Sequence, residues 1–166
     1  NGVCTDEATI VIDIVETPVI DPNSGSACDS LQLPSITGVG TAGAFYYTGT
    51  GGTGTQYTAG DWIYSSTTLY MYVAAGSCAA EEPYDITITV SPDVFDDAGA
   101  ACDEFILPTI TGTDLTGNEA YYDGPGGTGT QYNPGDIITS STTLYIYDAN
   151  GVCTDEATIV IDIVET

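Results

Sequence analysis

The sequence contains no lysine, arginine or histidine, although its 166 residues include 24 aspartates and glutamates, so the formal net charge is −24. Nucleic acid is excluded as a partner, because no cationic side chain is present to contact phosphates. A Walker-type nucleotide site and catalysis by imidazole or a lysine Schiff base are excluded for the same reason. The fold must therefore form without salt bridges between side chains.

Long apolar runs and helical periodicity are also missing. No run reaches about 18 apolar residues, so no segment is expected to insert into a membrane. The sequence lacks a starting methionine and a signal peptide, and we expect it to be an excerpt of a longer, processed chain. Disorder is not expected despite the charge, because 42% of the residues are apolar and twelve are tyrosine.

Internal repeats organise what is present. The 17 residues NGVCTDEATIVIDIVET at 1–17 recur identically at 150–166. A looser repeat, spaced by 74 or 75 residues, aligns the cysteine-led segments 28–38 and 102–112. A spacing this long is typical of an array of separate domains rather than a solenoid. We predict three parts, with a further repeat expected after Thr166: residues 1–17 as the last strand of a preceding, incomplete repeat, and whole repeats at 18–91 and 92–166.

Each repeat has the pattern of β-structure. Ile159, Ile161 and Ile163 alternate with other residues, and glycine and proline recur every 8–12 residues. Asn150-Gly151 predicts a hairpin turn, because both residues accept positive φ. The sequence predicts an all-β fold of tandem immunoglobulin-like β-sandwich domains of about 75 residues, arranged as beads on a string. The proline- and glycine-rich segments Pro18–Ala27 and Pro92–Ala101 are predicted linkers.

The five cysteines are Cys4, Cys28, Cys78, Cys102 and Cys153. One pairing lies within repeats, Cys28–Cys78 and Cys102–Cys153, and the other joins neighbouring repeats, Cys4–Cys28 and Cys78–Cys102. We favour the first pairing. In each pair the first cysteine is expected to begin the first strand of a sandwich and the second cysteine the last strand, and these two strands run roughly parallel from the same end. The second pairing would separate its partners by a strand of about 30 Å. Cys4 is then expected to pair with a cysteine upstream of this sequence. Free thiols and a metal cluster are disfavoured alternatives.

The favoured pairing would also gather carboxylates near each disulfide. Carboxylates without cations repel one another unless they are protonated or metal-bound, and oxygen ligands suit Ca²⁺. We hypothesise Ca²⁺ at the domain junctions, with solvated loop acids as the alternative. The candidate ligands are Asp93, Asp96, Asp97, Asp103, Glu104, Asp155 and Glu156, and in the earlier repeat Asp21, Asp29, Glu81 and Glu82.

Other motifs have simpler explanations. Asp61 and Asp136 follow glycine in both repeats and are predicted to cap turns. The segment GGTGTQY lacks the lysine of a phosphate loop and is predicted to be a hairpin. Trp62, Tyr46, Tyr47, Tyr121 and Tyr122 suggest either a sugar-stacking face or, as the favoured interpretation, core packing. No carboxylate pair is distinguished from the others, so we predict that the chain is not an enzyme.

The repeat unit C-D-x-x-x-L-P-x-I-T-G, followed by Y-Y, GGTGTQY, T-L-Y-x-Y and a late cysteine, resembles the tandem repeats of giant Bacteroidota surface adhesins. These are exported by type IX secretion and include SprB-like gliding-motility adhesins. The likeness spans essentially the whole chain and is strongest at Leu115–Tyr122, whereas the first repeat departs from it at Val39–Phe45. It also implies O-glycosylation at Asp-Ser-apolar sites, which would place a sugar on Ser30.

The resemblance implies the structural repeat region of an extracellular filament that supports attachment and gliding, anchored to the outer membrane through regions outside this sequence. Its partners would be neighbouring repeats of the same polypeptide, with surfaces or polysaccharides as targets. The alternatives are an array of glycan-binding modules and a self-assembling matrix or sheath fibre, in which the identical 17-residue segments would exchange strands.

Overall fold

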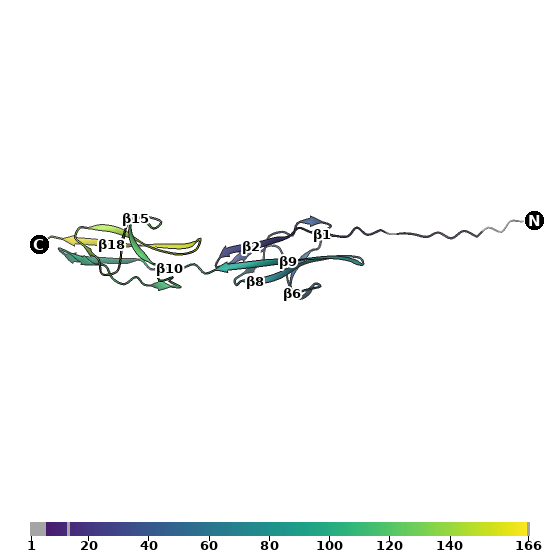
Figure 1. Cartoon of the computed structure of the whole chain (residues 1–166), viewed down its shortest axis with the longest axis horizontal. Coiled ribbons are helices and arrows are strands. Elements are labelled where there is room, and N and C mark those ends of the chain that lie inside the picture. The colour runs from purple at the N-terminus through teal and green to yellow at the C-terminus, as the bar shows by residue number, and fades with distance from the viewer. Residues whose placement is uncertain (1–5, 13, 166) are drawn as a thin grey trace, which may run out of the picture. The chain divides into compact units, whose positions relative to one another are not determined.

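The computed structural model describes residues 6–12 and 14–165, and its regular structure there is entirely β (Figure 1). The predicted all-β class is thereby confirmed. The described residues contain no helix of the length and apolarity needed to cross a membrane.

Each whole repeat folds into nine strands in the same order. In the first repeat they are β1 (Val19–Ile20), β2 (Asn23–Cys28), β3 (Leu31–Gln32), β4 (Gly38–Val39), β5 (Phe45–Gly49), β6 (Thr53–Tyr57), β7 (Trp62–Ile63), β8 (Thr67–Ala75) and β9 (Cys78–Thr89). In the second they are β10 (Asp93–Val94), β11 (Asp97–Cys102), β12 (Phe105–Ile106), β13 (Gly112–Thr113), β14 (Ala120–Gly124), β15 (Thr128–Tyr132), β16 (Ile137–Ile138), β17 (Thr142–Asn150) and β18 (Cys153–Val164).

The two repeats also share one sheet topology. A five-stranded sheet has the order β2-β9-β8-β5-β6 in the first repeat and β11-β18-β17-β14-β15 in the second. Two short pairs complete each repeat, β1-β4 with β3-β7 and β10-β13 with β12-β16. The first and last strands of the second repeat run parallel, with Asp97 opposite Ile159 and Cys102 opposite Val164.

Side-chain alternation explains why these segments form a sandwich. Leu144 and Ile146 of β17 and Ile159 and Ile161 of β18 all point to one face and are buried. They pack with Val94, Leu107, Ile110, Tyr121, Ile138 and Ala157 in a single apolar cluster. Burial of this face is the main favourable term available to a chain that has no ion pairs.

The chain divides into two compact units that do not coincide with the sequence repeats. Unit 1 comprises 1–25, 32–63 and 67–86, and unit 2 comprises 26–31, 64–66 and 87–166. Unit 2 therefore includes three short segments of the first repeat, 26–31, 64–66 and 87–91, and the first of them carries Cys28.

The segments predicted as linkers are strands instead. Pro18–Ala27 contains β1 and most of β2, and Pro92–Ala101 contains β10 and most of β11. Their small residues conceal the strands, because Ala98-Gly99-Ala100-Ala101 has low intrinsic β-propensity. A Cβ at Gly99 would lie 2.2 Å from the ring of Phe105, so any larger residue would require this ring to move. The strand is therefore specified by close packing rather than by side-chain type.

The two copies of the 17-residue segment differ in structure. Residues 153–164 form β18, whereas the described part of 1–17 has no assigned strand and is exposed. Ile10, Val11, Ile12 and Ile14 are between 77% and 88% exposed, while Ile159 and Ile161 are buried. The strand assignment for 1–17 stays a prediction, and Cys4 lies outside the described residues.

Candidate functional site

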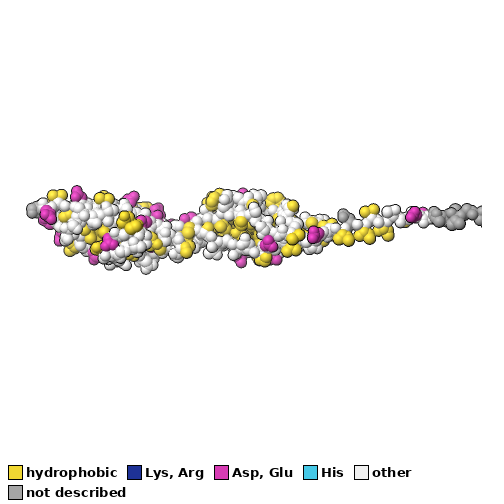
Figure 2. Space-filling view, turned by 90° about the horizontal axis from the view of Figure 1, so that it is seen from above, with side chains coloured by type: hydrophobic (Ala, Val, Ile, Leu, Met, Phe, Trp, Pro, Cys, Tyr) yellow, Lys and Arg dark blue, Asp and Glu magenta, His cyan; other side chains and the backbone are white. Residues whose placement is uncertain are grey.

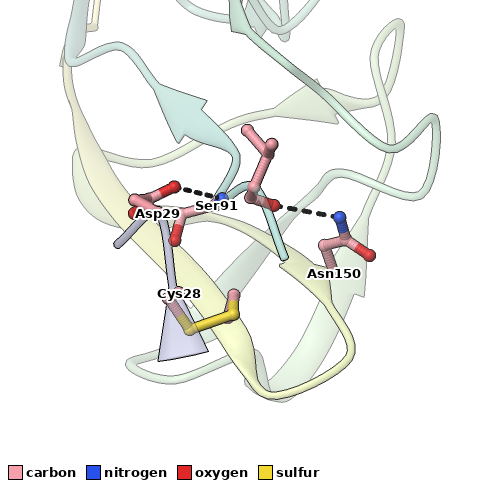
Figure 3. Close-up of a disulfide and its surroundings, with 6 residues drawn as sticks. Cys28, Asp29, Ser91 and Asn150 are labelled. Carbon is pink, nitrogen blue, oxygen red and sulfur yellow. Dashed lines mark hydrogen bonds between the residues drawn. A yellow bond between two sulfur atoms is a disulfide. The ribbon is translucent and has the colours of Figure 1, made fainter. Parts of the chain in front are cut away.

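The most distinctive site is a disulfide between Cys28 and Cys153, with a Cα–Cα distance of 5.7 Å (Figure 3). Both cysteines belong to unit 2, although Cys28 comes from the first sequence repeat and Cys153 from the second. Cys28 ends β2, and Cys153 follows the β17–β18 turn and is buried. The bond therefore links the first cysteine of one repeat to the late cysteine of the next.

This pairing corrects the predicted Cys28–Cys78 and Cys102–Cys153 bonds. The first and last strands do run parallel, but Cys102 closes β11 instead of opening it and lies opposite Val164. Cys153 begins the same 12-residue strand that Val164 ends. At about 3.3 Å per residue, nearly the full strand separates Cys102 from Cys153, far beyond disulfide range. Cys78 and Cys102 are free thiols, the first half-buried and the second exposed.

Three hydrogen bonds near the disulfide hold the residues that end or follow β9. The backbone N–H of Asp29 donates to the carbonyl of Thr89 over 3.0 Å. The carboxylate of Asp29 accepts the N–H of Ser91 over 2.8 Å, and the side-chain amide of Asn150 donates to the carbonyl of Val90 over 2.9 Å (Figure 3). The N–H of Ser91 stabilises the charged carboxylate and lowers the pKa of Asp29. The residues that follow β9 are thus held by Asp29, next to one cysteine of the disulfide, and by Asn150, on the hairpin that carries the other.

Local conformation favours an aspartate at position 29, and strand pairing positions Asn150. Asp29 has a φ of 61°, a left-handed conformation that Asp and Asn adopt more readily than most residues. Asn150 pairs with Cys153 across the hairpin, and Gly151, with a φ of 65°, begins the two-residue turn. A hairpin turn joins the last two strands as predicted, but its two residues are Gly151 and Val152, because Asn150 is the last residue of β17 and does not have a positive φ.

The structure does not bring the candidate calcium ligands together. Among the described residues, no group of three or more cysteine, aspartate or glutamate side chains is placed to hold a metal ion. Figure 2 shows the acidic side chains dispersed over the face in view. The calcium hypothesis therefore has no support from the structure.

Most of these carboxylates accept hydrogen bonds from the protein instead. Asp155 accepts the N–H of Val94 over 2.8 Å, and Asp96 accepts the N–H of Thr158 over 2.7 Å. Glu81 and Glu156 accept the N–H groups of Gly51 and Gly126 in equivalent hairpins. The further acceptors are Asp93 from Thr113 and Asp97 from Ala98, whereas Asp21, Asp103 and Glu104 are exposed and Glu82 is half-buried.

The aromatic candidates are mainly packed inside the sandwiches. Tyr46 and Tyr121 are buried, and their hydroxyls donate to the carbonyls of Pro34 and Pro108 over 3.0 and 3.1 Å. Burial raises the pKa of each phenol to about 12. Core packing, the favoured interpretation, is confirmed for these two residues. Trp62 is 51% exposed.

The remaining aromatic candidates pack edge-on against neighbouring strands. The ring of Tyr47 lies 6.1 Å from that of Tyr72, and the ring of Tyr122 lies 6.2 Å from that of Tyr147. These half-buried rings support the sheet, because edge-on aromatic pairs are favourable packing arrangements.

Two predicted caps are confirmed, and the predicted sugar site is half-buried. Asp61 accepts the N–H of Thr58 over 2.6 Å, and Asp136 accepts that of Asn133 over 2.7 Å. Ser30 donates its N–H to the carbonyl of Cys28 over 2.6 Å, immediately beside the disulfide. Glycosylation of Ser30 stays a prediction.

Sequence reasoning missed a buried carboxylate at Asp148. It is 1% exposed and accepts the N–H of Thr116 over 2.7 Å, the hydroxyl of Thr116, and the N–H of Ala149 over 2.8 Å. The signal was the strand alternation itself, because Asp148 follows Leu144 and Ile146 at an inward position. The corresponding residue of the first repeat is Val73, which is also buried.

A hollow of about 330 Å³ in unit 2 is lined by Asp123 and by residues of β15 to β17. Asp123 accepts the N–H of Thr130 over 2.7 Å, and this hydrogen bond lowers the pKa of the carboxyl. Thr48, its counterpart in the first repeat, accepts the N–H of Thr55 over 2.9 Å. Asp123 therefore has a structural role as a hydrogen-bond acceptor, and the hydroxyl of Thr48 fills the same role in the first repeat.

The chain matches no family model and no curated protein. Among solved structures, it is similar to extracellular domains 3–5 of Drosophila OTK, with 9% identity and a TM-score of 0.50 over 90% of this chain and 63% of that one. It is also similar to titin domains I67–I69, with 9% identity, a TM-score of 0.42, and coverage of 92% and 67%. The insect immune protein hemolin matches with 12% identity, a TM-score of 0.45, and coverage of 89% and 47%. The sheet topology and the likeness to OTK show the predicted tandem immunoglobulin-like fold, and the chain spans less than two thirds of the OTK structure.

Proposed function

We propose that this chain is part of the structural repeat region of a long extracellular surface filament or adhesin that supports attachment. The observation that carries the proposal is a repeated sandwich whose consecutive copies are joined by the Cys28–Cys153 disulfide. Disulfides persist mainly in oxidising compartments, which favours a location outside the cytoplasm. The absence of cations leaves a uniformly negative surface, which keeps neighbouring filaments apart.

The repeat motifs extend this proposal to the SprB-like adhesins of Bacteroidota and to gliding motility. On this proposal the chain is exported by type IX secretion, is anchored to the outer membrane elsewhere in the protein, and contacts surfaces or polysaccharides. Its role is to space and position binding regions, so it has no enzymatic activity of its own.

Immunogold electron microscopy of intact producing cells tests the location directly, using an antibody raised against this chain. Label along filaments that project from the cell surface is expected. Label that is confined to shed material or absent from filaments contradicts the proposal. Preadsorption of the antibody with the purified chain provides the control for specific labelling.

Glycan binding is a second candidate function, and the exposure of Trp62 favours it. This indole is half exposed on β7, where it is available to stack on a sugar ring. A glycan array probed with the native chain and with Trp62→Ala separates the two functions. Binding that Trp62→Ala abolishes supports a glycan-binding module, whereas a spacer binds nothing in either form.

Assembly into a matrix or sheath is the third candidate, and the exposed apolar residues of 6–17 favour it. Their sequence recurs in β18, where Ile159 and Ile161, the equivalents of Ile10 and Ile12, are buried. Light scattering over a range of concentrations tests this candidate. Growth of oligomers with concentration supports strand exchange, and a constant monomer mass contradicts it.

A further inference from the structure

The local backbone structure around Cys28 and Cys153 recurs around the two free cysteines, Cys102 and Cys78. Cys102 ends β11 as Cys28 ends β2, and each is followed by an aspartate in the left-handed conformation, with φ of 66° at Asp103 and 61° at Asp29. Asp103 donates its N–H to Val164 over 3.1 Å, as Asp29 does to Thr89 over 3.0 Å. Cys102 therefore has the backbone setting of the first cysteine of the link.

Cys78 has the setting of the other half. It begins β9 directly opposite Ala75 across a two-residue turn, just as Cys153 begins β18 opposite Asn150. The turns begin with Gly76 and Gly151, whose φ angles are 59° and 65°. Cys78 is half-buried and Cys102 is exposed, so both thiols are accessible in part.

A second observation comes from the residues that precede the first repeat. Val15 occupies the position of Val164 in the repeated 17-residue segment. A Cβ built on Gly76 would lie 3.5 Å from Cγ2 of Val15, so the end of this segment lies beside the β8–β9 turn. Val15 is 40% exposed, whereas Ile14 is 87% exposed. The end of the 1–17 segment therefore lies beside the turn that precedes Cys78. In the same way, the residues that follow β9 lie beside the turn that precedes Cys153.

We propose that Cys102 and Cys78 are the two open halves of the same link, and that their partner is a further repeat of this kind. Cys102 bonds to the late cysteine of a repeat that follows it, and Cys78 bonds to the first cysteine of a repeat that precedes it. Every junction in such an array then carries one disulfide that crosses the repeat boundary. This inference concerns purified protein and does not rest on an adhesive role.

The bond forms by oxidation of two thiols with a low-molecular-weight disulfide such as oxidised glutathione. The thiolate of one cysteine attacks the oxidant and releases one reduced glutathione, which leaves a mixed disulfide on the protein. The second cysteine then attacks this mixed disulfide and releases the second glutathione. The two protein thiols lose two electrons and two protons in total, and these reduce one oxidised glutathione to two thiols.

The repeated segment allows a direct test without an artificial junction. In the native chain residue 18 follows the segment 1–17, and residues 150–166 have the same sequence as 1–17. A second copy of residues 18–91 joined after Thr166 therefore reproduces the native junction. This extended chain offers Cys102 the appended copy of Cys78. Both the native and the extended chain are folded in a glutathione redox buffer and then treated with iodoacetamide without denaturant.

The expected result is that Cys102 is alkylated in the native chain and at least 100-fold more slowly in the extended chain. Peptic mapping at low pH should recover Cys102 joined to the appended copy of Cys78, together with Cys28–Cys153. Replacing the appended copy of Cys78 by serine is the matched control, and it should restore alkylation of Cys102. Equal alkylation in both chains, or Cys102 bonded to Cys153 or to either copy of Cys28, overturns the proposal.

A reciprocal extension keeps the test decisive if the appended repeat does not fold. A copy of residues 92–149 placed before Asn1 uses 1–17 as its last segment and offers Cys78 the added copy of Cys102. The link is supported if Cys78 is protected from alkylation in this chain and if this protection is lost when the added copy of Cys102 is replaced by serine. A Cys78 thiol that reacts equally in both extended chains, with the Cys28–Cys153 bond intact, contradicts it.

Discussion

Replacing Asp148 by valine should destabilise unit 2 through the loop that contains Thr116. The side chain of Asp148 is buried within β17, and two of the three groups that donate to it belong to Thr116. Valine fits a strand position of this kind, because Val73 is buried at the corresponding place in the first repeat. The substitution therefore removes acceptors without a large change in volume.

Hydrogen bonds to charged groups contribute about 1.5–3 kcal/mol each, and donors left without partners carry a further penalty that hydration of the half-buried loop reduces. We expect Asp148→Val to lower the free energy of unfolding by about 3 kcal/mol and Thr116→Val by about 2 kcal/mol. Replacing both partners by apolar groups is often nearly neutral relative to one replacement, so the double variant should lose only about 3 kcal/mol. The expected coupling is thus about 2 kcal/mol, within the range for residues in contact.

Urea unfolding followed by far-ultraviolet circular dichroism measures these differences. Fluorescence of Trp62, the single tryptophan, reports unit 1 in the same samples and should keep its transition. Glu104→Ala is the matched control, since it removes an exposed carboxylate and should change stability by less than about 0.5 kcal/mol. Additive effects of the two substitutions, with a coupling below about 0.5 kcal/mol, would refute the assigned role of Asp148.

Three further predictions follow from the disulfide, the buried phenols and the hairpin glycines. Cys28→Ser should cost up to about 5 kcal/mol in thermal or urea unfolding, because the bond closes a separation of 125 residues, whereas an equal cost for Cys102→Ser would contradict the assigned pairing. The raised pKa of Tyr46 and Tyr121, about 12 against an ordinary 10.0, means that the folded chain retains both protons where the unfolded chain loses them. Their contribution to stability is therefore complete below pH 10 and is lost as the pH rises toward 12, and in an alkaline titration of tyrosinate absorbance Tyr46→Phe and Tyr121→Phe should each remove one late-ionising group. Gly126→Ala should lower the free energy of unfolding by about 1 kcal/mol, because alanine is strained in the left-handed conformation of this residue but has open space around its Cβ. Gly127→Ala should lower it clearly more, because its Cβ would also lie 2.7 Å from the ring of Tyr147. Equal shifts in thermal unfolding would refute this packing argument.

The fold was predictable because its signals are local. The alternation of Ile159, Ile161 and Ile163 predicts a strand with one inward face, and in β18 the first two are buried and Ile163 is partly buried. The hairpin after β17 was predictable from Gly151, which has a positive φ, although Asn150 proved to belong to the strand. Such signals need only neighbours in sequence, so they can be recognised without the structure.

The disulfide pairing was not predictable by the same means. Its prediction depended on whether Cys102 opens or closes the first strand, and the small residues before it were interpreted as a linker. In the structure β11 ends at Cys102 and pairs with β18 through residues with little β-propensity, so tertiary packing decides the strand. Misplacing the first strand of each repeat moved Cys28 and Cys102 to the wrong end of that strand, whereas Cys78 and Cys153 do begin their strands as predicted.

The calcium hypothesis depended on the same assumption. It placed Asp155 and Glu156 near Asp103 only because Cys153 was paired with Cys102. The actual partners of Asp155 and Glu156 are the backbone N–H groups of Val94 and Gly126. A loop-to-strand contact of this kind links residues far apart in sequence and has no local signature.

The Cys28–Cys153 bond also determines how the chain transmits a pulling force. Tension applied at the two termini passes from Cys28 directly to Cys153, so the residues between them are not stretched while the bond is intact. A separation of 125 residues at 3.3–3.6 Å each corresponds to roughly 400 Å of extended chain. Under oxidising conditions the protein is therefore a short tether, and reduction of a single bond turns it into one with this additional length in reserve.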